Sequence, residues 1–191
     1  GLVDGTWAGT LVIESAEDIV RAWGVVNIAG DLRIQHAGDI RALPGLDKLE
    51  SVSGDLVITN NPSLSKLSAL ASLSSVGGDV VVERNPALKS LDGLNGLTAL
   101  DGGLSVSDNS ALESLAAIET VVTVGGDLDI LDNAKLPQAD AEAYAARAGL
   151  TVTGDIAVAG NADRYEPNDE SSAATPFSEL GRDAYRATLS I

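Results

Sequence analysis

Few side chains in this sequence could take part in catalysis, and they are mostly carboxylates together with one histidine, His36. A serine–histidine–aspartate mechanism would have to use His36, and cysteine chemistry is excluded because the 191 residues include no cysteine. The segment closest to a G-x-S-x-G turn, residues 103–107, lacks the closing glycine. Phosphate-binding loops and H-E-x-x-H zinc motifs are absent from the sequence. We therefore expect a non-enzyme, with a glycoside-cleaving pair among the many aspartates as the alternative.

Five of the aspartates each follow a glycine at the same place in a repeating pattern. They are Asp31, Asp55, Asp79, Asp127 and Asp155, and Gly103 stands where a sixth would fall. If the pattern stacks as β-strands, the carboxylates lie about 4.8 Å apart and repel one another. Backbone N–H groups of a Gly-Asp turn can stabilise each anion, so we expect a ladder of carboxylates that caps the turns. The alternative is Ca²⁺ held between neighbouring coils, because this ion binds several oxygen ligands; no other cofactor is expected.

The elements that would hold these side chains repeat every 24 residues. Each repeat opens with a glycine, and these are Gly30, Gly54, Gly78, Gly102 and Gly126, followed after 28 residues by Gly154. With that glycine counted as position 0, positions 2 and 4 are apolar in every repeat, as in Leu56 and Ile58. This alternation predicts a short strand with positions 2 and 4 facing inward. A fixed period of this length is typical of a solenoid, in which each coil buries its apolar face against its neighbours.

After the strand, apolar residues recur at intervals of three, for example at Leu64, Leu67, Leu70 and Leu73. On an α-helix such a stripe would slip by about 60° at each step, whereas a stable amphipathic helix mixes steps of three and four. The spacing of three instead fits short 3₁₀ turns or extended segments. Each coil is therefore predicted to consist of a strand, a corner and a winding return path whose leucines point inward.

An asparagine occupies position 7, at the corner between the strand and the return path. The column consists of Asn61, Asn85, Asn109, Asn133 and Asn161. A buried amide at a corner can satisfy backbone groups that the turn leaves unpaired, and stacked amides form a ladder. We interpret this column as a structural brace and not as a ligand site.

The string L-x-I-x-x-N-P-x-L-x-x-L resembles a leucine-rich repeat with one extra residue after the asparagine. The 24-residue coil, the GD-L-x-I opening and the N-P-x-L corner are still more similar to receptor L domains, over roughly residues 9–161. This resemblance implies a mainly β fold, a right-handed parallel β-solenoid with 24-residue coils and short capping helices. Receptor L domains occur in insulin and growth-factor receptor ectodomains and have bacterial relatives in secreted surface proteins. The disulfides of the receptor examples have no counterpart here, because the chain lacks cysteine.

The solenoid is expected to span residues 1–161 and to be capped at both ends. The N-terminal cap, residues 1–29, would hold a strand at 11–13 and a short helix at about 16–22, which begins with a capping-box pattern at Ser15 and Asp18. A second capping helix is predicted at 137–149, between Pro137 and Gly149. Residues 162–191 are expected to be a linker and the incomplete start of a β-sandwich, because residues 165–176 resemble the opening of bacterial pre-peptidase C-terminal domains.

The composition fits an extracellular protein. A formal net charge of −16 argues against nucleic acids and anionic lipids as partners. The sequence has no apolar run long enough to cross a membrane, so no direct membrane insertion is expected. The lack of cysteine favours a bacterial source over an animal receptor. We therefore expect a secreted or cell-surface protein of bacterial origin.

The outward strand positions 3, 5 and 6 provide the candidate binding face, since this sheet is the open surface of leucine-rich solenoids. The candidate residues are Arg33, Gln35, His36, Val57, Thr59, Asn60, Val81, Glu83, Arg84, Ser107, Asp108, Asp129 and Asp132. Their chemistry varies from coil to coil, whereas the inward positions are uniform.

We interpret this face as a recognition or adhesion surface for protein or glycan on a cell surface, or for further domains of the same chain. Two alternatives remain open at this stage. The chain could be a structural spacer or self-assembling surface subunit without a ligand, or the noncatalytic arm of a secreted hydrolase.

Overall fold

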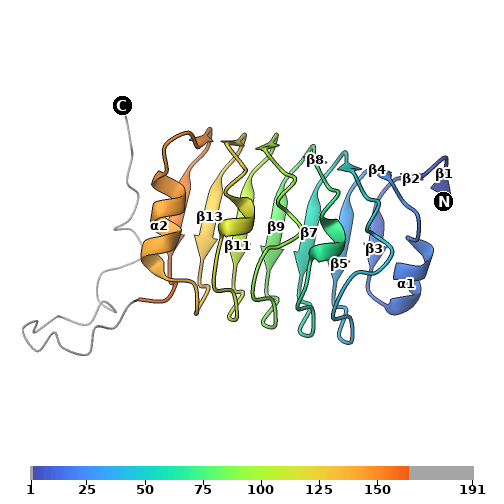
Figure 1. Cartoon of the computed structure of the whole chain (residues 1–191), viewed down its shortest axis with the longest axis horizontal. Coiled ribbons are helices and arrows are strands. Elements are labelled where there is room, and N and C mark those ends of the chain that lie inside the picture. The colour runs from blue at the N-terminus through green and yellow to red at the C-terminus, as the bar shows by residue number, and fades with distance from the viewer. Residues whose placement is uncertain (1, 164–191) are drawn as a thin grey trace, which may run out of the picture.

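The computed structural model describes residues 2–163 as a stack of flat coils (Figure 1), and the predicted sandwich start lies outside these residues except for its first two. Strands and helices follow in the order β1 Leu2–Val3, β2 Thr6–Ala8, β3 Leu11–Ile13, α1 Ala16–Arg21, β4 Asn27–Ala29, β5 Leu32–Gln35, β6 Ser51–Val52, β7 Leu56–Thr59, η1 Ser68–Leu70, β8 Ser75–Val76, β9 Val80–Glu83, β10 Ala99–Leu100, β11 Leu104–Ser107, η2 Ala116–Ile118, β12 Thr123–Val124, β13 Leu128–Leu131, α2 Gln138–Ala146, β14 Thr151–Val152 and β15 Ile156–Ala159. Both η elements are single 3₁₀ turns.

One long sheet of seven parallel strands runs the length of the stack, in the order β15-β13-β11-β9-β7-β5-β3. Each strand pairs in register with its counterpart in the next coil, so that Leu32 lies beside Leu56 and Leu56 beside Val80. Because this register equals the sequence period, equivalent positions of successive coils form straight columns. The predicted β-solenoid is therefore confirmed.

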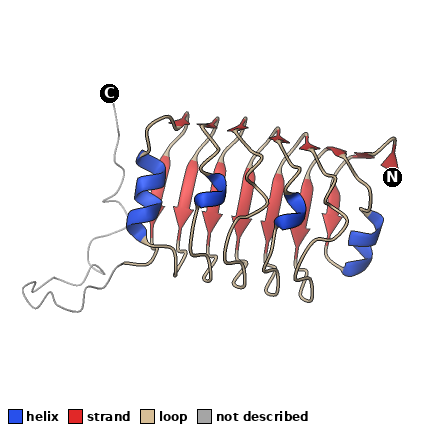
Figure 2. Ribbon diagram, in the orientation of Figure 1, coloured by secondary structure: helices blue, strands red, loops and turns tan. Residues whose placement is uncertain are grey.

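The opposite corner of the coils carries very short strands (Figure 2). They form a five-stranded sheet, β1-β2-β4-β6-β8, and a three-stranded sheet, β10-β12-β14. Within the described residues only β1 and β2 pair in the antiparallel sense. The strand β2 pairs with β4 in the five-stranded sheet, and β3 pairs with β5 in the long sheet. The residues predicted as an N-terminal cap therefore form a first coil of the solenoid, and α1 is the return path of this coil.

The core is aliphatic, and the spacing of three in the return path has a hydrogen-bond origin. The N–H of Leu70 donates to the carbonyl of Leu67 at 2.8 Å, and the N–H of Leu73 donates to Leu70 at 2.9 Å. The same i to i−3 bond recurs in the other coils, for example from Leu94 to Leu91. A three-residue turn returns each leucine to the same side, so these side chains are fully buried.

Both helices are shorter than predicted. The helix α1 ends at Arg21, and its start has the predicted capping box, in which Ser15 and Asp18 each bond the backbone of the other. The helix α2 begins at Gln138 and ends at Ala146, because Arg147 takes an extended conformation and turns its side chain to the preceding coil.

Candidate binding face of the long sheet

The outward side of the long sheet presents positions 3 and 5 of every coil, and we call this surface the sheet face. Its side chains are Val12, Arg33, Gln35, Val57, Thr59, Val81, Glu83, Ser105, Ser107, Asp129, Leu131, Ala157 and Ala159. Val12 was missed by the sequence interpretation. Its signal was the alternation of Leu11, Val12 and Ile13, which places the middle residue outward once β3 pairs with β5.

Position 6 lies just beyond the strand and has a left-handed backbone. His36, Asn60, Arg84, Asp108 and Asp132 have φ between 52° and 56°. The equivalent residue of the last coil is Gly160, with φ of 71°. These side chains therefore belong to a corner, whereas the sequence interpretation placed them on the strand. The signal for this turn was the frequency of Asn, Asp, His and Gly in the column, since these residues tolerate positive φ best.

Several side chains of the sheet face are already hydrogen-bonded to one another. Gln35 donates to Glu14 at 2.8 Å, and Thr59 donates to Glu83 at 2.9 Å. Asn60 also donates to the Thr59 hydroxyl at 2.9 Å. Thr59 is only 8% exposed, so this residue of the candidate binding face offers little of its side chain to a ligand.

The two arginines of this region are also paired. Arg33 donates to Asp31 at 3.0 Å. Arg84 lies 3.0 Å from Glu83 and 3.9 Å from Asp108. The first pair neutralises charge at positions 1 and 3 of the first 24-residue repeat, and the second does so at positions 5 and 6 of middle coils. The side chains of Arg33 and Arg84 stay 41% and 55% exposed.

The aspartate column links one coil to the next. Oδ1 of Asp31 accepts the N–H of Asp55 at 3.1 Å, and Oδ1 of Asp55 accepts that of Asp79 at 3.0 Å. The donor is thus the following coil and not the aspartate's own Gly-Asp turn. This contact also explains the glycine column, because a Cβ on Gly54 would lie 2.2 Å from Oδ1 of Asp31.

The arrangement of the column gives no support to the calcium alternative. Among residues 2–163, no three Asp, Glu or His side chains come together as ligands of a metal ion would. One oxygen of each of Asp31, Asp55, Asp79 and Asp127 is engaged by a backbone amide of the next coil.

The asparagine column is a continuous buried ladder. The amide of Asn85 donates to the carbonyl of Ile58 at 2.9 Å and to Oδ1 of Asn109 at 3.2 Å. Its own Oδ1 accepts both the backbone N–H and the side-chain amide of Asn61, at 3.2 and 2.9 Å. Asn61, Asn85, Asn109 and Asn133 are fully buried and repeat this pattern from coil to coil. The column therefore closes the core at the corner and offers no free group to a ligand.

A hollow of about 300 Å³ interrupts the sheet face over β9, β11 and β13. We call it the acidic hollow and define it by Asp79, Val81, Gly103, Ser105, Asp127 and Asp129. It exists because Gly103 breaks the aspartate column and the small Ser105 lies below. Burial, and then the nearby charges of Asp127 and Asp155, raise the pKa of Asp129 above its ordinary value of 3.8.

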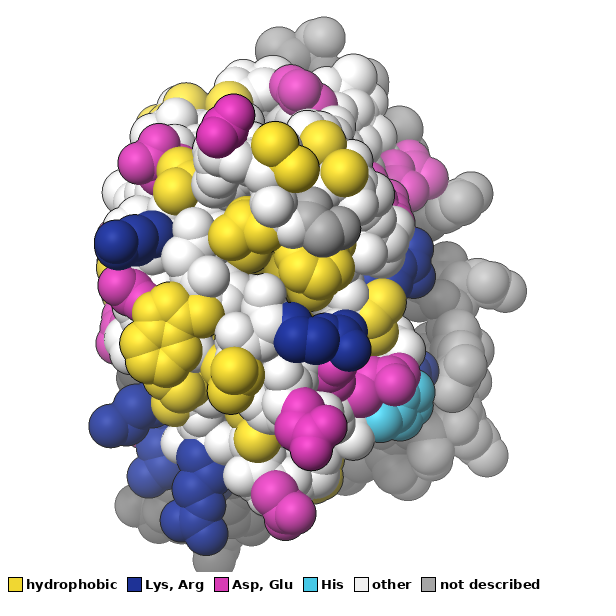
Figure 3. All heavy atoms as spheres, turned by 90° about the vertical axis from the view of Figure 1, so that its right-hand side faces the viewer, with side chains coloured by type: hydrophobic (Ala, Val, Ile, Leu, Met, Phe, Trp, Pro, Cys, Tyr) yellow, Lys and Arg dark blue, Asp and Glu magenta, His cyan; other side chains and the backbone are white. Residues whose placement is uncertain are grey.

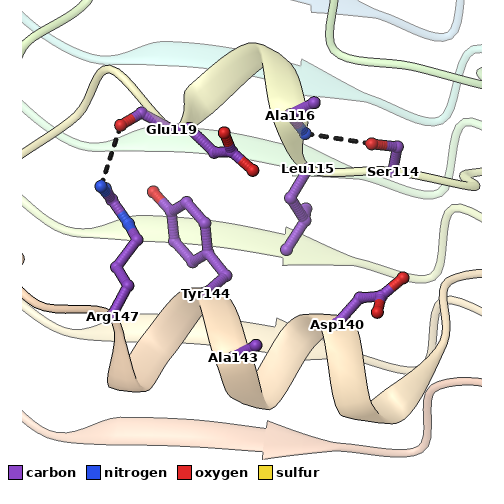
Figure 4. A pocket seen from close by; sticks show the side chains of 8 residues that line it. All are labelled: Ser114, Leu115, Ala116, Glu119, Asp140, Ala143, Tyr144 and Arg147. Carbon is purple, nitrogen blue, oxygen red and sulfur yellow. Dashed lines mark hydrogen bonds between the residues drawn. The ribbon is translucent and has the colours of Figure 1, made fainter.

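A second pocket, of about 430 Å³, lies between α2 and η2, away from the sheet face (Figure 4). Tyr144 donates to the carbonyl of Ile118 at 3.2 Å, and Arg147 donates to that of Glu119 at 2.9 Å and also to that of Val121. The guanidinium group lies 4.7 Å from the centre of the Tyr144 ring. These polar groups fasten α2 to the preceding coil, so we interpret this pocket as structural. The periodic columns gave no signal for it, since α2 replaces a regular return path.

Exposed apolar side chains gather at the N-terminal end of the stack (Figure 3). Leu2, Val3, Val20 and Trp23 are 42–68% exposed. The sheet face instead mixes polar and charged side chains with small apolar ones such as Val57 and Val81, and it carries no aromatic side chain.

A stack of parallel coils with an open, polar sheet face defines a solenoid scaffold of the leucine-rich type. The family model of the receptor L domain matches residues 26–145, which is more than half of the chain, and the chain therefore belongs to the receptor L-domain family. This family consists of noncatalytic ligand-binding domains that bind protein ligands and are typically extracellular. No curated protein matches the chain. Within residues 2–163, no helix is both long and apolar enough to cross a membrane.

Proposed function

We propose that this chain is an extracellular recognition module that binds a protein ligand on its sheet face. The observation that carries this proposal is the contrast between the two sides of the same strands. Inward positions are uniformly aliphatic, and they are buried in every strand of the long sheet except β15 at the end of the stack, where Ile156 is 36% exposed. Outward positions differ from coil to coil and, apart from Thr59, stay at least partly accessible on the seven adjoining strands. A rigid, flat scaffold with a chemically varied surface suits recognition, because little conformational entropy is lost when a partner docks.

The finer features of this function are also part of the proposal. Adhesion at a cell surface and secretion by a bacterium belong to this proposal. The acidic composition fits a secreted protein, and the lack of cysteine favours a bacterial source. A glycan ligand is an outcome that the experiment below separates from a protein ligand.

The experiment is a binding screen of the full 191-residue chain against separate arrays of extracellular proteins and of glycans. Each hit is then titrated with two variants, Ser107→Arg on the sheet face and Ser110→Arg on the exposed return path of the same coil. We expect Ser107→Arg to weaken binding by about tenfold or more, because a large charged side chain in the interface disrupts its packing. Ser110→Arg should bind as the parent does. Equal affinity of both variants for the hit would contradict a role of the sheet face.

A further inference from the structure

The acidic hollow has an origin specific to one coil of this chain. In four of the other coils position 1 is an aspartate whose Oδ1 covers the glycine of the next coil, as Asp55 covers Gly78. Gly103 has no side chain to do this, and Gly126 of the next coil lies against the Gly103 backbone instead. The sheet face is therefore open here, with Ser105 as its floor, Val81 on one side and Asp129 on the other.

Among residues 2–163, no lysine or arginine pairs with the carboxylates around this opening. Asp79 accepts the N–H of Gly103 at 2.7 Å, and Asp127 accepts that of Asp155 at 2.8 Å, each through Oδ1 alone. The Asp129 carboxylate makes no hydrogen bond or ion pair with any other residue of 2–163. None of the ion pairs within these residues involves Asp79, Asp127 or Asp129.

Elsewhere near the sheet face, carboxylates are paired with arginines, and in this the acidic hollow differs from its surroundings. Arg33 faces Asp31, and Arg84 lies between Glu83 and Asp108. Arg84 lies three residues after Val81, about 10 Å further along the strand direction, and it pairs with Glu83 and Asp108 instead of with the carboxylates of the hollow. The half-buried Asp129 is held near Asp127 and Asp155, and its pKa is raised first by burial and then by these two negative charges.

We propose that the acidic hollow receives a lysine or arginine side chain presented by a protein partner. The proposal rests on the function inferred above and names the chemistry of the ligand. The cationic head would lie at Asp127 and Asp129, whose charges already act on each other, while the aliphatic stem would lie along Val81 and over Ser105, as long basic side chains do on mixed surfaces. A volume of about 300 Å³ is at the lower limit of small-molecule pockets and suits one side chain better than a larger ligand.

The test uses the full chain and fluorescein-labelled hexaarginine, with hexaglutamine as the neutral peptide, followed by fluorescence anisotropy. Asp129→Asn should weaken hexaarginine binding by about tenfold, because a charge-assisted contact in a half-buried site is lost. Ser105→Arg should abolish it, since the introduced cation fills the hollow. Two matched controls, Asp101→Asn and Ser110→Arg, change exposed residues elsewhere and should bind as the parent does.

Three outcomes overturn the inference. If Asp101→Asn weakens binding as much as Asp129→Asn does, the attraction is a diffuse effect of net charge. If spermidine binds with the same dependence on Asp129 and Ser105, the hollow takes a free polyamine. If a protein ligand from the screen is lost with Ser107→Arg but is unaffected by Asp129→Asn, the proposed function stands and the inference about the hollow fails.

Discussion

At the scale of single residues, the buried asparagines of the ladder are the positions at which we expect a substitution to destabilise the fold most. Asn85→Ala would leave the carbonyl of Ile58 and the N–H of Asn61 buried without their present partners. We expect a loss of about 3 kcal/mol in the free energy of unfolding, because several buried polar groups lose partners at once. Urea unfolding measures this loss. The control is Asn95→Ala, at an exposed residue whose side chain accepts only the N–H of Gly93; a similar loss in both variants would contradict the role of the ladder.

The glycine and aspartate columns depend on each other across coils. A Cβ on Gly54 would lie 2.2 Å from Oδ1 of Asp31 and 3.1 Å from the Gly30 carbonyl group. Gly54→Ala should therefore cost about 1–3 kcal/mol of stability, as overpacking does. In the Asp31→Ala background the same substitution should cost less, since the closest atom is gone, and a double-mutant cycle measures this coupling. Gly38→Ala is the control, because nothing lies within 4 Å of its Cβ; purely additive losses would refute the coupling.

Two aspartates of the same sheet should respond to pH in opposite ways. The pKa of Asp129 is raised above 3.8, so its ionised form opposes folding, and this penalty builds as the pH rises through 3.8. The pKa of Asp31 is lowered, first by its hydrogen bond from Arg33, so its contribution is present above 3.8 and is lost as the pH falls through the folded-state value.

Asp129→Asn should therefore raise stability at about pH 7, by roughly 0.5 kcal/mol because the group is partly exposed. Asp31→Asn should lower it. The effect of Asp129→Asn should fade as the pH falls toward 3.8, whereas that of Asp31→Asn should fade only as the pH falls below 3.8. Chemical denaturation at about pH 7 and about pH 3 tests the two signs. Destabilisation by Asp129→Asn at neutral pH would contradict the assigned environment of this carboxylate.

At the scale of elements, α2 depends on two side chains for its place in the stack. Arg147 bonds the carbonyl groups of Glu119 and Val121, and Tyr144 bonds that of Ile118. Arg147→Ala should reduce the protection of α2 amides from hydrogen exchange and cost about 1–2 kcal/mol, since two carbonyl groups, one of them partly buried, lose a charged donor. Arg41→Ala, at an exposed position of a return path, is the matched control. Unchanged exchange in α2 would show that its apolar contacts suffice.

Periodic elements could be predicted from the sequence, and the exceptions to the period could not. Strand positions 2 and 4 and the three-residue steps follow from residue type and spacing alone. The bonding of Asp31 to the next coil was not predictable, because the sequence shows a Gly-Asp pair but not which turn it faces. The acidic hollow was visible only as a gap at Gly103, and its volume depends on how three neighbouring strands stack. The contacts of Tyr144 and Arg147 with the preceding coil do not recur in other coils, so the repeat pattern could not predict them.

At the scale of the whole molecule, stability should be distributed over the coils, because each contacts only its neighbours. Successive strands of the long sheet pair in the same register, so the two neighbours of a deleted coil can pair with each other in the same way. Removal of the coil formed by residues 55–78 would bring Leu32 beside Val80. The backbone N–H of Ala37 could then donate to Oδ1 of Asn85, as it now donates to Oδ1 of Asn61. Both the core columns and the ladder would be restored without a change in geometry.

Deletion of residues 55–78, which joins Gly54 to Asp79, should therefore give a shorter folded solenoid. One of the seven strands of the long sheet is lost, so the urea m-value should fall by about one seventh, in proportion to the surface that unfolding exposes. Deletion of residues 55–66 is the control, since half a coil moves every later column out of register and should prevent folding. Circular dichroism and urea titration compare the two chains. A single coil deletion that unfolds the protein as completely as the half-coil deletion would show that the stack is one indivisible unit.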